Sequence, residues 1–390
     1  MGKTIAILSE DFPEKSGGIA QWAAGAAQGL HDLGHRVIVI TRRWKEYPAP
    51  AEGAYGFSIR FIRGNHWKKL RTWYWRQAVA RLYAEGVRPD LLIATTWNAG
   101  RGTFGIAARH RTRTALVVHG LEVTRRMGCI KQWWCGNTLH KADTIVAVSA
   151  FTGQRVADAF SIDKNKMVTI PNGVDILRFK PGIDSSALRG RLGLHNRNVL
   201  LTLARIVERK GQDQVIRALP AIIKKVPDVT YCVAGDPRGD HTQTLKALVA
   251  ELRLENHVRF AGYVEPAELP AFYNLCDVYV MPSHEIASSG DTEGFGITFL
   301  EANACEKPVI GGNSGGVVDA IVDGETGFLV DPLDIAAIAE KAILLLTDKA
   351  RAEKLGRQGR ERIEKGFTWR VISERMMESI FSHGGHEGII

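Results

Sequence analysis

The chain has 390 residues, of which 45% are hydrophobic and 24% are charged, a composition typical of soluble globular proteins at a length that suits two domains. No apolar run is long enough to span a membrane and the start lacks the apolar core of a signal peptide, so we expect a cytoplasmic protein. The net charge of +9 indicates an anionic substrate, a membrane surface or nucleic acid as partner.

Short β-like runs alternate with helix-length segments in the first half of the chain. Strands are predicted at 3–8, 36–41, 91–95, 114–118 and 144–148, and a helix at 18–33. This alternation is typical of a parallel sheet that helices cover on both faces. The first half is therefore predicted to be a doubly wound α/β unit.

The turn after the first predicted strand contains Gly17 and Gly18 but not the pattern G-x-G-x-x-G. The fingerprint of dinucleotide binding is thus absent from the turn where it belongs. Two glycines before a helix still allow a ligand to approach the backbone closely. The alternative interpretation is a flexible turn that binds nothing.

His119 and Gly120 directly follow the apolar strand predicted at 114–118. They lie at the carboxyl end of a parallel strand, which is where ligands bind in such sheets. The glycine suggests that the backbone comes close to another molecule here. A histidine with a structural role only is the alternative.

Two segments of the first half, 64–76 and 125–134, combine tryptophan with lysine and arginine. Tryptophan beside cations is typical of membrane interfaces when both lie on one amphipathic face. Aromatic and cationic residues together also bind single-stranded nucleic acid. The interpretation that we favour is that the tryptophans are core residues and the cations are solvated. Membrane docking ranks second and nucleic-acid binding last.

The five cysteines are scattered along the chain, with Cys129 and Cys135 as the only near pair. No pattern of cysteine and histidine around them matches a zinc site. We therefore expect reduced thiols with structural roles and no metal site.

The segment 171–181, P-N-G-V-D-I-L-R-F-K-P, interrupts the alternation and is typical of a connector. A second alternating series follows it. Strands are predicted at 198–203, 230–234, 257–261, 278–281 and 308–311, helices at 212–225, 242–252, 266–276 and 296–305, and an almost entirely helical tail at 335–381. The chain is thus predicted to form two doubly wound units, with its ligand in the cleft between them.

Arg205 and Lys210 come directly after the first strand of the second series. Two cations at this end of a strand suit a diphosphate, because arginine binds phosphate as a fork and lysine as a point charge. The alternative is a solvated basic loop.

The segment 291–304, D-T-E-G-F-G-I-T-F-L-E-A-N-A, places Glu293 and Glu301 on either side of a predicted helix start. Gly294 and Gly296 leave the backbone N–H groups there without covering side chains, which makes an anion site. The carboxylates repel a phosphate but accept hydrogen bonds from hydroxyl groups. A phosphate cradle flanked by acceptors for hydroxyls is the arrangement that a nucleotide sugar requires.

Together these residues resemble glycosyltransferase family 4, whose members are retaining enzymes of the GT-B fold. The resemblance covers nearly the whole chain, and its motifs occur in the family's order. The motifs are Gly17-Gly18, His119-Gly120, P-N-G-V-D at 171–175, Arg205 with Lys210, A-G-D at 234–236, G-Y-V at 262–264, E-G-F-G with Glu301, S-G-G at 314–316 and D-G-E-T-G-F-L-V-D-P at 323–332. The spacing Glu293-x7-Glu301 downstream of Arg205-x4-Lys210 is the most specific of them.

The resemblance implies a role for each site position. Glu301 would hold the ribose hydroxyls, Glu293 the hydroxyls of the transferred sugar, and Arg205 with Lys210 the diphosphate; His119 would lie beside the donor sugar. The implied catalytic residues are His119, Arg205, Lys210 and Glu293. The implied donor-binding residues are Gly17, Gly18, Arg205, Lys210, Val264, Glu293, Gly294, Phe295, Gly296, Ile297, Thr298 and Glu301.

The family's organisation implies an acceptor-side domain at 1–175, a nucleotide-sugar domain at 176–366, and a C-terminal helix at 367–390 that crosses back to the first domain. The family's reaction transfers a sugar from a nucleoside diphosphate to a hydroxyl with retention of the anomeric configuration. No metal and no cofactor are expected, because Arg205, Lys210 and a helix N-terminus supply the positive charge.

The segments 283–292 and 299–316 are most similar to the branch that contains phosphatidylinositol mannosyltransferases. This similarity implies GDP-mannose as the donor and a glycolipid, a lipid-linked oligosaccharide or a polysaccharide precursor as the acceptor. It also fits peripheral contact of the first domain with the inner face of a membrane. We expect no nucleic acid as partner. A transferase that uses UDP-glucose or UDP-GlcNAc, a sugar-nucleotide epimerase and a non-catalytic binding protein stay open as alternatives.

Overall fold

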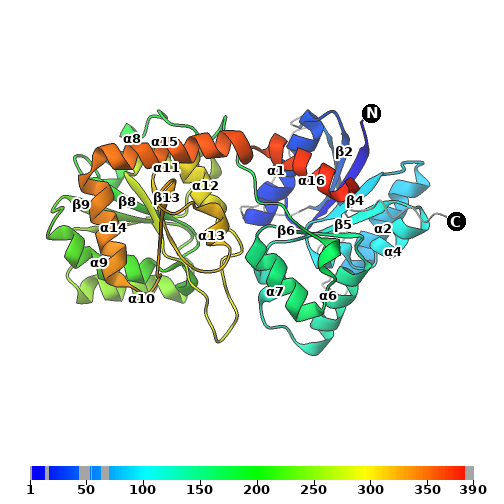
Figure 1. Ribbon diagram of the computed structural model, residues 1–390, viewed down its shortest axis with the longest axis horizontal. Helices are drawn as coiled ribbons and strands as arrows, with labels where there is room; N and C mark the ends of the chain where they lie inside the picture. The colour runs from blue at the N-terminus through cyan, green and yellow to red at the C-terminus, as the bar shows by residue number, and fades with distance from the viewer. Residues whose placement is uncertain (1, 14–16, 44–52, 54, 63–69, 383–390) are drawn as a thin grey trace. The chain divides into compact units, whose positions relative to one another are not determined.

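The computed structural model describes residues 2–13, 17–43, 53, 55–62 and 70–382. The chain forms two compact units (Figure 1). Unit 1 contains Met1–Gly173 together with the C-terminal segment from Trp369, and unit 2 contains Val174–Thr368. Residues 64–69 of the first segment rich in tryptophan and cations lie outside the described residues.

Unit 1 is built on a parallel sheet with the strand order β3-β2-β1-β4-β5-β6-β7. Its strands are β1 Thr4–Ser9, β2 Arg36–Arg42, β3 Ser58–Ile62, β4 Leu91–Ala94, β5 Arg113–Val118, β6 Thr144–Ala147 and β7 Met167–Thr169. Every residue of β4 and β6 is buried, so both faces of the sheet are covered. The five predicted strands are confirmed. The prediction lacks β3 and β7 because both are edge strands with few buried side chains.

Helices alternate with these strands and leave short turns at their carboxyl ends. They are α1 Gly18–Asp32, α2 Arg71–Ala84, α3 Trp97–Gly100, α4 Phe104–Arg109, α5 Leu121–Thr124, α6 Cys129–Lys141, α7 Ala150–Phe160 and α16 Trp369–Ser382. The short helices α3 and α5 begin within three residues of the ends of β4 and β5, which holds the residues after those strands in fixed positions.

The last helix, α16, packs against α1 in unit 1. Two glycines of α1 allow this approach: a Cβ on Gly25 would lie 2.0 Å from the Trp369 ring, and one on Gly29 would lie 2.3 Å from the Trp369 carbonyl oxygen. The Arg370 guanidinium also donates a hydrogen bond to the carbonyl of Asp32 at 3.0 Å. Small residues one turn apart therefore determine where the end of the chain docks.

Unit 2 has a parallel sheet with the order β10-β9-β8-β11-β12-β13. Its strands are β8 Asn198–Leu203, β9 Val229–Ala234, β10 Val258–Gly262, β11 Val278–Met281, β12 Val309–Gly312 and β13 Gly327–Val330. The five predicted strands are confirmed, and β13 adds an edge strand with only its end residues fully buried.

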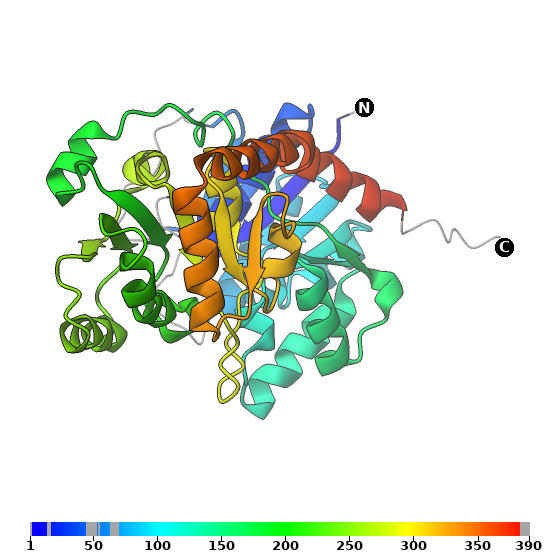
Figure 2. The same ribbon diagram turned by 60° about the vertical axis from the view of Figure 1, so that its left-hand side comes forward.

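The helices of unit 2 cover its sheet, and Figure 2 shows α14 along the strands β12 and β13, which it contacts. They are α8 Ser186–Leu192, α9 Gln212–Ile223, α10 Asp240–Glu251, α11 Leu269–Leu275, α12 Ile297–Ala304, α13 Val317–Ala320, α14 Ile335–Thr347 and α15 Lys349–Gly366, with 3-10 turns η3 Glu208–Lys210 and η4 Pro266–Glu268. The helical tail predicted at 335–381 is three helices. It breaks at Asp348, whose side chain caps α15, and again before α16.

Each sheet reverses its strand order at one point. In unit 1 the chain runs from β1 outward to β3 and then returns to β4 on the other side of β1; in unit 2 it does the same with β8 and β11. The loops that follow the two strands at such a point diverge, which leaves room for a ligand beyond their carboxyl ends. A ligand-binding site in unit 2 is therefore expected at the loops after β8 and β11.

Candidate active site

The loops after β8 and β11 bring two cations onto one carboxylate. The Nζ of Lys210 lies 2.6 Å from Oε2 of Glu293. The Nη1 of Arg209 donates a hydrogen bond to the same oxygen, with 2.5 Å between nitrogen and oxygen. The three side chains are only 8%, 13% and 7% exposed, in the order Lys210, Glu293, Arg209. Charges buried to this degree are stable only when they are paired, so this cluster ties the two loops together.

The neighbouring charges set the ionisation of the cluster. Burial alone would raise the pKa of Glu293, but the positive charges of Lys210 and Arg209 outweigh it and lower the pKa to about 2. Burial lowers the pKa of Lys210 to about 8, although Glu293 acts in the other direction. Near neutral pH the cluster therefore holds one carboxylate and two cations, with a net positive charge.

The backbone around Glu293 depends on two glycines in left-handed conformations. Gly296, with φ +91°, precedes α12, and a Cβ there would lie 2.7 Å from the Phe299 ring. Gly315, with φ +61°, would place a Cβ 2.6 Å from the Glu293 carbonyl oxygen, which accepts a hydrogen bond from the N–H of Gly316 at 2.8 Å. Side chains at these positions would displace the carboxylate from its cations.

The first turn of α12 offers backbone donors to an anion. Its N-cap, Gly296, provides no side-chain hydrogen bond, so the first N–H groups of the helix depend on other acceptors. Gly294 and Phe295 are buried just before the helix, and Ile297 and Thr298 are partly exposed at its start. The predicted donor-binding run 293–298 thus connects the ion-pair cluster to the start of α12, with its partly exposed residues at the two ends of the run.

Arg205 lies near the cluster but has a different environment. It follows β8 and its side chain is exposed, while its backbone carbonyl accepts a hydrogen bond from Gln212 at 3.0 Å. Its charge contributes to the lowered pKa of Lys210. The structure therefore brings Arg205, Lys210 and Glu293 together, and it leaves the guanidinium of Arg205 accessible from solution.

Glu301, about one turn into α12, is buried. Its Oε2 accepts a hydrogen bond from the hydroxyl of Tyr273 at 2.5 Å. Burial raises the pKa of Glu301 to about 7, although the Tyr273 hydrogen bond and the charge of Arg178 act in the opposite direction. The carboxyl group therefore changes its charge near neutral pH.

Val264 lies after the carboxyl end of β10, two strands from β8 in the sheet, and is buried. The neighbouring Tyr263 is 47% exposed. Val264 takes no part in the ion pairs of Glu293 or the hydrogen bond of Glu301. The assignment of Val264 to donor binding stays a prediction from the resemblance.

In unit 1, Gly17 and Gly18 lie at the start of α1, beyond the carboxyl end of β1. Gly17 adopts φ +146°, a conformation that side-chain-bearing residues rarely adopt. A Cβ on either glycine would meet no atom of the described residues within 4 Å. The start of α1 is thus open to the approach of another molecule.

His119 follows β5 in the same unit. Its ring packs edge-to-face on Trp22 with 5.7 Å between centroids and hydrogen bonds to the backbone of Thr95. Its Nε2 is buried and lacks a partner among the described residues. Burial lowers the pKa of His119 to about 4, so near neutral pH the imidazole is neutral and can accept a hydrogen bond from a hydroxyl group.

Three residues that form hydrogen bonds to predicted site residues are absent from the prediction. Arg209 stands directly before Lys210, and a count of the cations in 205–210 would have singled it out. Glu122 accepts a hydrogen bond from the backbone N–H of His119, and its place three residues later in a predicted turn is a weak capping signal. Tyr273 gave no signal, because it lies in an ordinary buried helix segment.

The described part of the chain contains no group of three or more His, Cys, Asp or Glu side chains placed to hold a metal ion. The five cysteines are free, and four of them are buried.

Family models match both halves of the chain. Residues 16–178 match the model described as Glycosyltransferase Family 4, and residues 184–362 match the model described as Glycosyl transferases group 1. The two matches meet close to the division between the compact units.

The chain is also similar to characterised proteins over its full length. It is 33% identical over 378 residues to a GDP-mannose-dependent alpha-(1-6)-phosphatidylinositol monomannoside mannosyltransferase of Mycolicibacterium smegmatis, with 95% of this chain and 97% of that protein covered. A protein of the same description from Mycobacterium tuberculosis is 31% identical over 381 residues, with 96% and 97% covered.

Solved structures share the fold at lower identity. The Anabaena protein Alr3699/HepE in complex with UDP and glucose superposes with a TM-score of 0.80 at 22% identity, covering 97% of this chain and 100% of that one. Sucrose-phosphate synthase from Thermosynechococcus elongatus gives 0.78 at 22% identity, with 97% and 98% covered. With the two sheets described above, these matches confirm the prediction of an α/β chain with two doubly wound, Rossmann-like domains of the GT-B class.

Glu301 should make the stability of the protein depend on pH. The folded state keeps the Glu301 proton up to about pH 7, whereas the unfolded chain loses it near the ordinary glutamate pKa of 4.5. The free energy of unfolding therefore falls as the pH rises through this window. For Glu301→Gln, we expect the stability relative to the wild type to shift by about 3 kcal/mol in favour of the variant between pH 4.5 and pH 8. Urea unfolding followed by circular dichroism measures this difference.

The comparison with the wild type is needed because His119 contributes in the opposite direction. The neutral histidine of the folded state adds to the free energy of unfolding as the pH rises from about 4 to the ordinary histidine pKa of 6.5. This contribution is the same in the wild type and in Glu301→Gln. Glu255→Gln, on the exposed surface, is the matched control. A difference between Glu301→Gln and the wild type that does not change with pH would contradict the raised pKa.

Glu293→Gln should destabilise the protein strongly, because it leaves two buried cations without their counter-charge. We expect a loss of about 3–5 kcal/mol in the free energy of unfolding. Adding Lys210→Met to this variant removes one of the uncompensated charges, so the double variant should lose less than Glu293→Gln alone. Urea unfolding measures the coupling energy between Glu293 and Lys210 when it is applied to the wild type, both single variants and the double variant. Additive losses would show that the three charges do not act as a unit.

Proposed function

The chain belongs to glycosyltransferase family 4, and we propose that it transfers mannose from GDP-mannose to a hydroxyl group of a glycolipid. The observation that carries this proposal is the cluster of Lys210 and Arg209 on Glu293 at the start of α12. It sets buried positive charge beside backbone donors and a carboxylate, as a nucleoside diphosphate sugar requires. The relatives named as GDP-mannose-dependent mannosyltransferases support the choice of mannose and of a lipid acceptor.

In the proposed reaction the bond between the anomeric carbon and the diphosphate breaks, and negative charge develops on the departing phosphate oxygen. Lys210, Arg205 and the N-terminal N–H groups of α12 would stabilise that charge from fixed positions. Lys210 is held by Glu293 at 2.6 Å, so little reorganisation is needed during the reaction. These groups supply the positive charge that a divalent cation provides elsewhere, and we therefore propose a reaction without a metal.

We propose that the configuration of the anomeric carbon is retained through attack on the same face from which the diphosphate departs. The alternative, a covalent intermediate on Glu293, requires an available nucleophile. The Oε2 of Glu293 is shared by Lys210 and Arg209, and its pKa is about 2, so the carboxylate is weakly nucleophilic. Its role is better described as fixing the cations and accepting hydrogen bonds from sugar hydroxyls.

The remaining groups would position the donor. Ionised Glu301 would accept hydrogen bonds from the two ribose hydroxyls, and Val264 would pack near the base. The neutral His119 imidazole would accept a hydrogen bond from a sugar hydroxyl through Nε2, which has no partner among the described residues. Glu122 would fix the loop that carries His119.

A lipid acceptor calls for contact with a membrane surface, and we propose peripheral contact through unit 1. Trp73 on α2 is 52% exposed and Trp133 on α6 is 66% exposed, whereas tryptophan is normally buried in a soluble domain. Ile130 is exposed on α6 as well. None of the helices that the structure describes is long and apolar enough to cross a bilayer.

A nucleotide panel with a transfer assay tests the donor and the reaction. We expect GDP to raise the melting temperature more than UDP or ADP at equal concentration, because selective binding stabilises the folded state. With GDP-mannose and a phosphatidylinositol-based acceptor we expect a mannosylated lipid with an α-linkage, detected by mass spectrometry and NMR. Lys210→Met should lower kcat/KM by about two to three orders of magnitude, with Glu255→Gln as the control.

Each other outcome supports a different function. Preferential stabilisation by UDP with transfer from UDP-glucose or UDP-GlcNAc would replace the mannosyl donor within the same family. A sugar nucleotide converted to its epimer without an acceptor would indicate an epimerase. Selective binding with neither transfer nor hydrolysis would indicate a binding protein.

Donor binding should depend on pH through Glu301. If the ribose hydroxyls bind the ionised carboxylate, a pKa of about 7 in the free protein means that the Kd of GDP-mannose falls about fivefold between pH 6 and pH 7. Lys210, with a pKa of about 8, stays mostly charged over this range. The diphosphate of GDP-mannose is esterified at both ends and does not titrate in this range. Calorimetric titration of the wild type and of Glu301→Gln measures the effect. The variant should bind more weakly at pH 7 and show little change with pH, and an unchanged pH dependence would exclude Glu301 as its source.

A further inference from the structure

Unit 1 contains a hollow on its outer helices that has no part in the proposed transfer. It has a volume of about 200 Å³ and lies among α2, α4, α6 and the turn before α4. Four cations, Arg76, Arg101, Arg109 and Lys141, are among the residues that line it, and no acidic residue is. It uses none of the residues assigned above to the donor or to the reaction.

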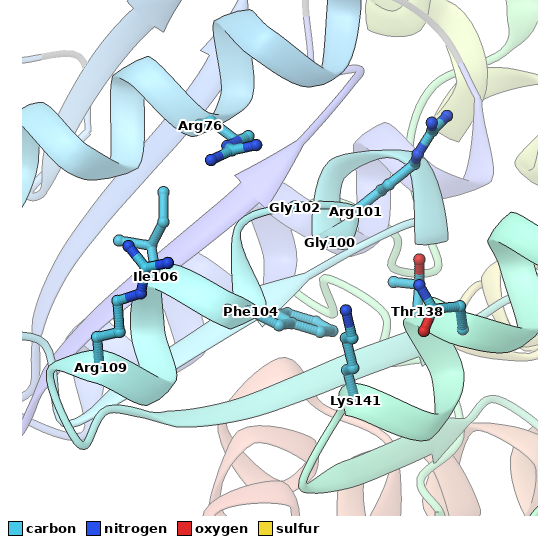
Figure 3. Close-up of a pocket in the computed structure, with 11 residues that line it drawn as sticks. Arg76, Gly100, Arg101, Gly102, Phe104, Ile106, Arg109, Thr138 and Lys141 are labelled. Carbon is cyan, nitrogen blue, oxygen red and sulfur yellow. The ribbon is translucent and has the colours of Figure 1, made fainter.

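Three of the four cations face the hollow. In Figure 3, Arg76 from α2, Arg109 from α4 and Lys141 from α6 lie around the ring of Phe104, and the ammonium group of Lys141 points toward the space between them. Arg101 turns its guanidinium away from the other three in this view and stacks on Trp134, 3.4 Å from the ring centroid. The three cations therefore come from three separate helices.

Among the residues that the structure describes, Arg76, Arg109 and Lys141 differ from neighbouring cations in having no carboxylate partner. On α2, Arg71 pairs with Glu10 at 3.4 Å and Arg81 pairs with Glu85 at 2.8 Å. Within the described ranges, no carboxylate forms an ion pair with Arg76, Arg109 or Lys141. Three like charges around one hollow repel each other, and a bound anion removes that repulsion.

The floor of the hollow is shaped for a compact group. Phe104 is buried beneath it, and a Cβ on Gly100 would lie 2.9 Å from the Phe104 ring. Gly102 has φ +77°, and a Cβ there would lie 3.0 Å from the Arg76 side chain. These glycines let the turn before α4 pass close to Arg76 and keep the space between the cations open. Asn137 and Thr138 add polar groups at its wall.

We propose that this hollow is a binding site for a phosphate ester, held by Arg76, Arg109 and Lys141. Arginine forks and a lysine point charge together bind the tetrahedral oxygens of such a group. A second hollow of about 580 Å³ shares Arg76, Ile106 and Arg109 with it and adds Arg88, so the cationic surface continues beyond the site. The ester can belong to a soluble metabolite or to a lipid headgroup, and the two sources share this chemistry.

The test compares two variants of the full chain with the same loss of charge. The first is Arg76→Gln/Arg109→Gln/Lys141→Gln. The second, the control, is Arg217→Gln/Lys224→Gln/Lys246→Gln, which removes three exposed cations of unit 2. All changed residues are exposed, so both variants should keep the circular dichroism spectrum and the melting temperature of the wild type.

Two binding assays separate the sources of the phosphate ester. One titrates inorganic phosphate and glycerol 3-phosphate by calorimetry with saturating GDP present, so that the proposed diphosphate site is occupied. The other sediments vesicles of phosphatidylglycerol or of phosphatidylcholine at physiological salt, where exposed charges are screened. In at least one assay we expect the first variant to bind about tenfold more weakly than the wild type, and the control to match the wild type.

The pattern of loss identifies the source. A loss with the soluble esters alone assigns the site to a metabolite, and a loss with phosphatidylglycerol vesicles alone assigns it to a lipid headgroup. Equal losses in both variants, or none in the first, would overturn the proposal, because general charge would then account for binding. These readouts involve no sugar transfer, so they stand apart from the donor and acceptor proposed above.

Discussion

The ion-pair cluster of Glu293 with Lys210 and Arg209 is the interaction on which the arrangement of the loops after β8 and β11 depends. It joins the loop after β8 to the loop after β11 through one carboxylate oxygen, at 2.6 and 2.5 Å. Separating a buried ion pair raises the free energy of the folded protein by more than the intact pair lowers it. The two loops therefore cannot move apart independently. The start of α12 and the cations beside it are thereby fixed before any ligand arrives.

The two carboxyl groups of this segment have pKa values that their surroundings drive in opposite directions. Glu293 meets two cations and has a pKa of about 2, whereas Glu301 is buried against Tyr273 and has a pKa of about 7. Carboxyl groups with separated pKa values can perform different tasks at one pH. Glu293 behaves as a permanent charge that holds the cations, and Glu301 can gain or lose a proton near neutral pH.

Continuous apolar runs in the sequence predicted the buried strands β4, β6 and β11, and the structure confirms them. The motif spacing also singled out Arg205, Lys210 and Glu293, which the structure brings together, while their role in donor binding stays a prediction. The edge strands β3 and β13 were missed because half-exposed strands have mixed composition. Tyr273 was missed for another reason: its contact with Glu301 joins residues 28 positions apart and has no local pattern. Such partners depend on tertiary packing alone.

The net charge of +9 could not by itself distinguish the cations that bind a ligand from those that support the fold. The structure shows which of these cations have a carboxylate partner. Arg71 and Arg81 each pair with a carboxylate. Lys210 and Arg209 both pair with the buried carboxylate of Glu293. Arg76 and Arg109 lack such a partner among the described residues and face a common hollow. Because unpaired like charges that face one another raise the free energy of the empty protein, an anion that enters the hollow gains both attraction and relief of that repulsion.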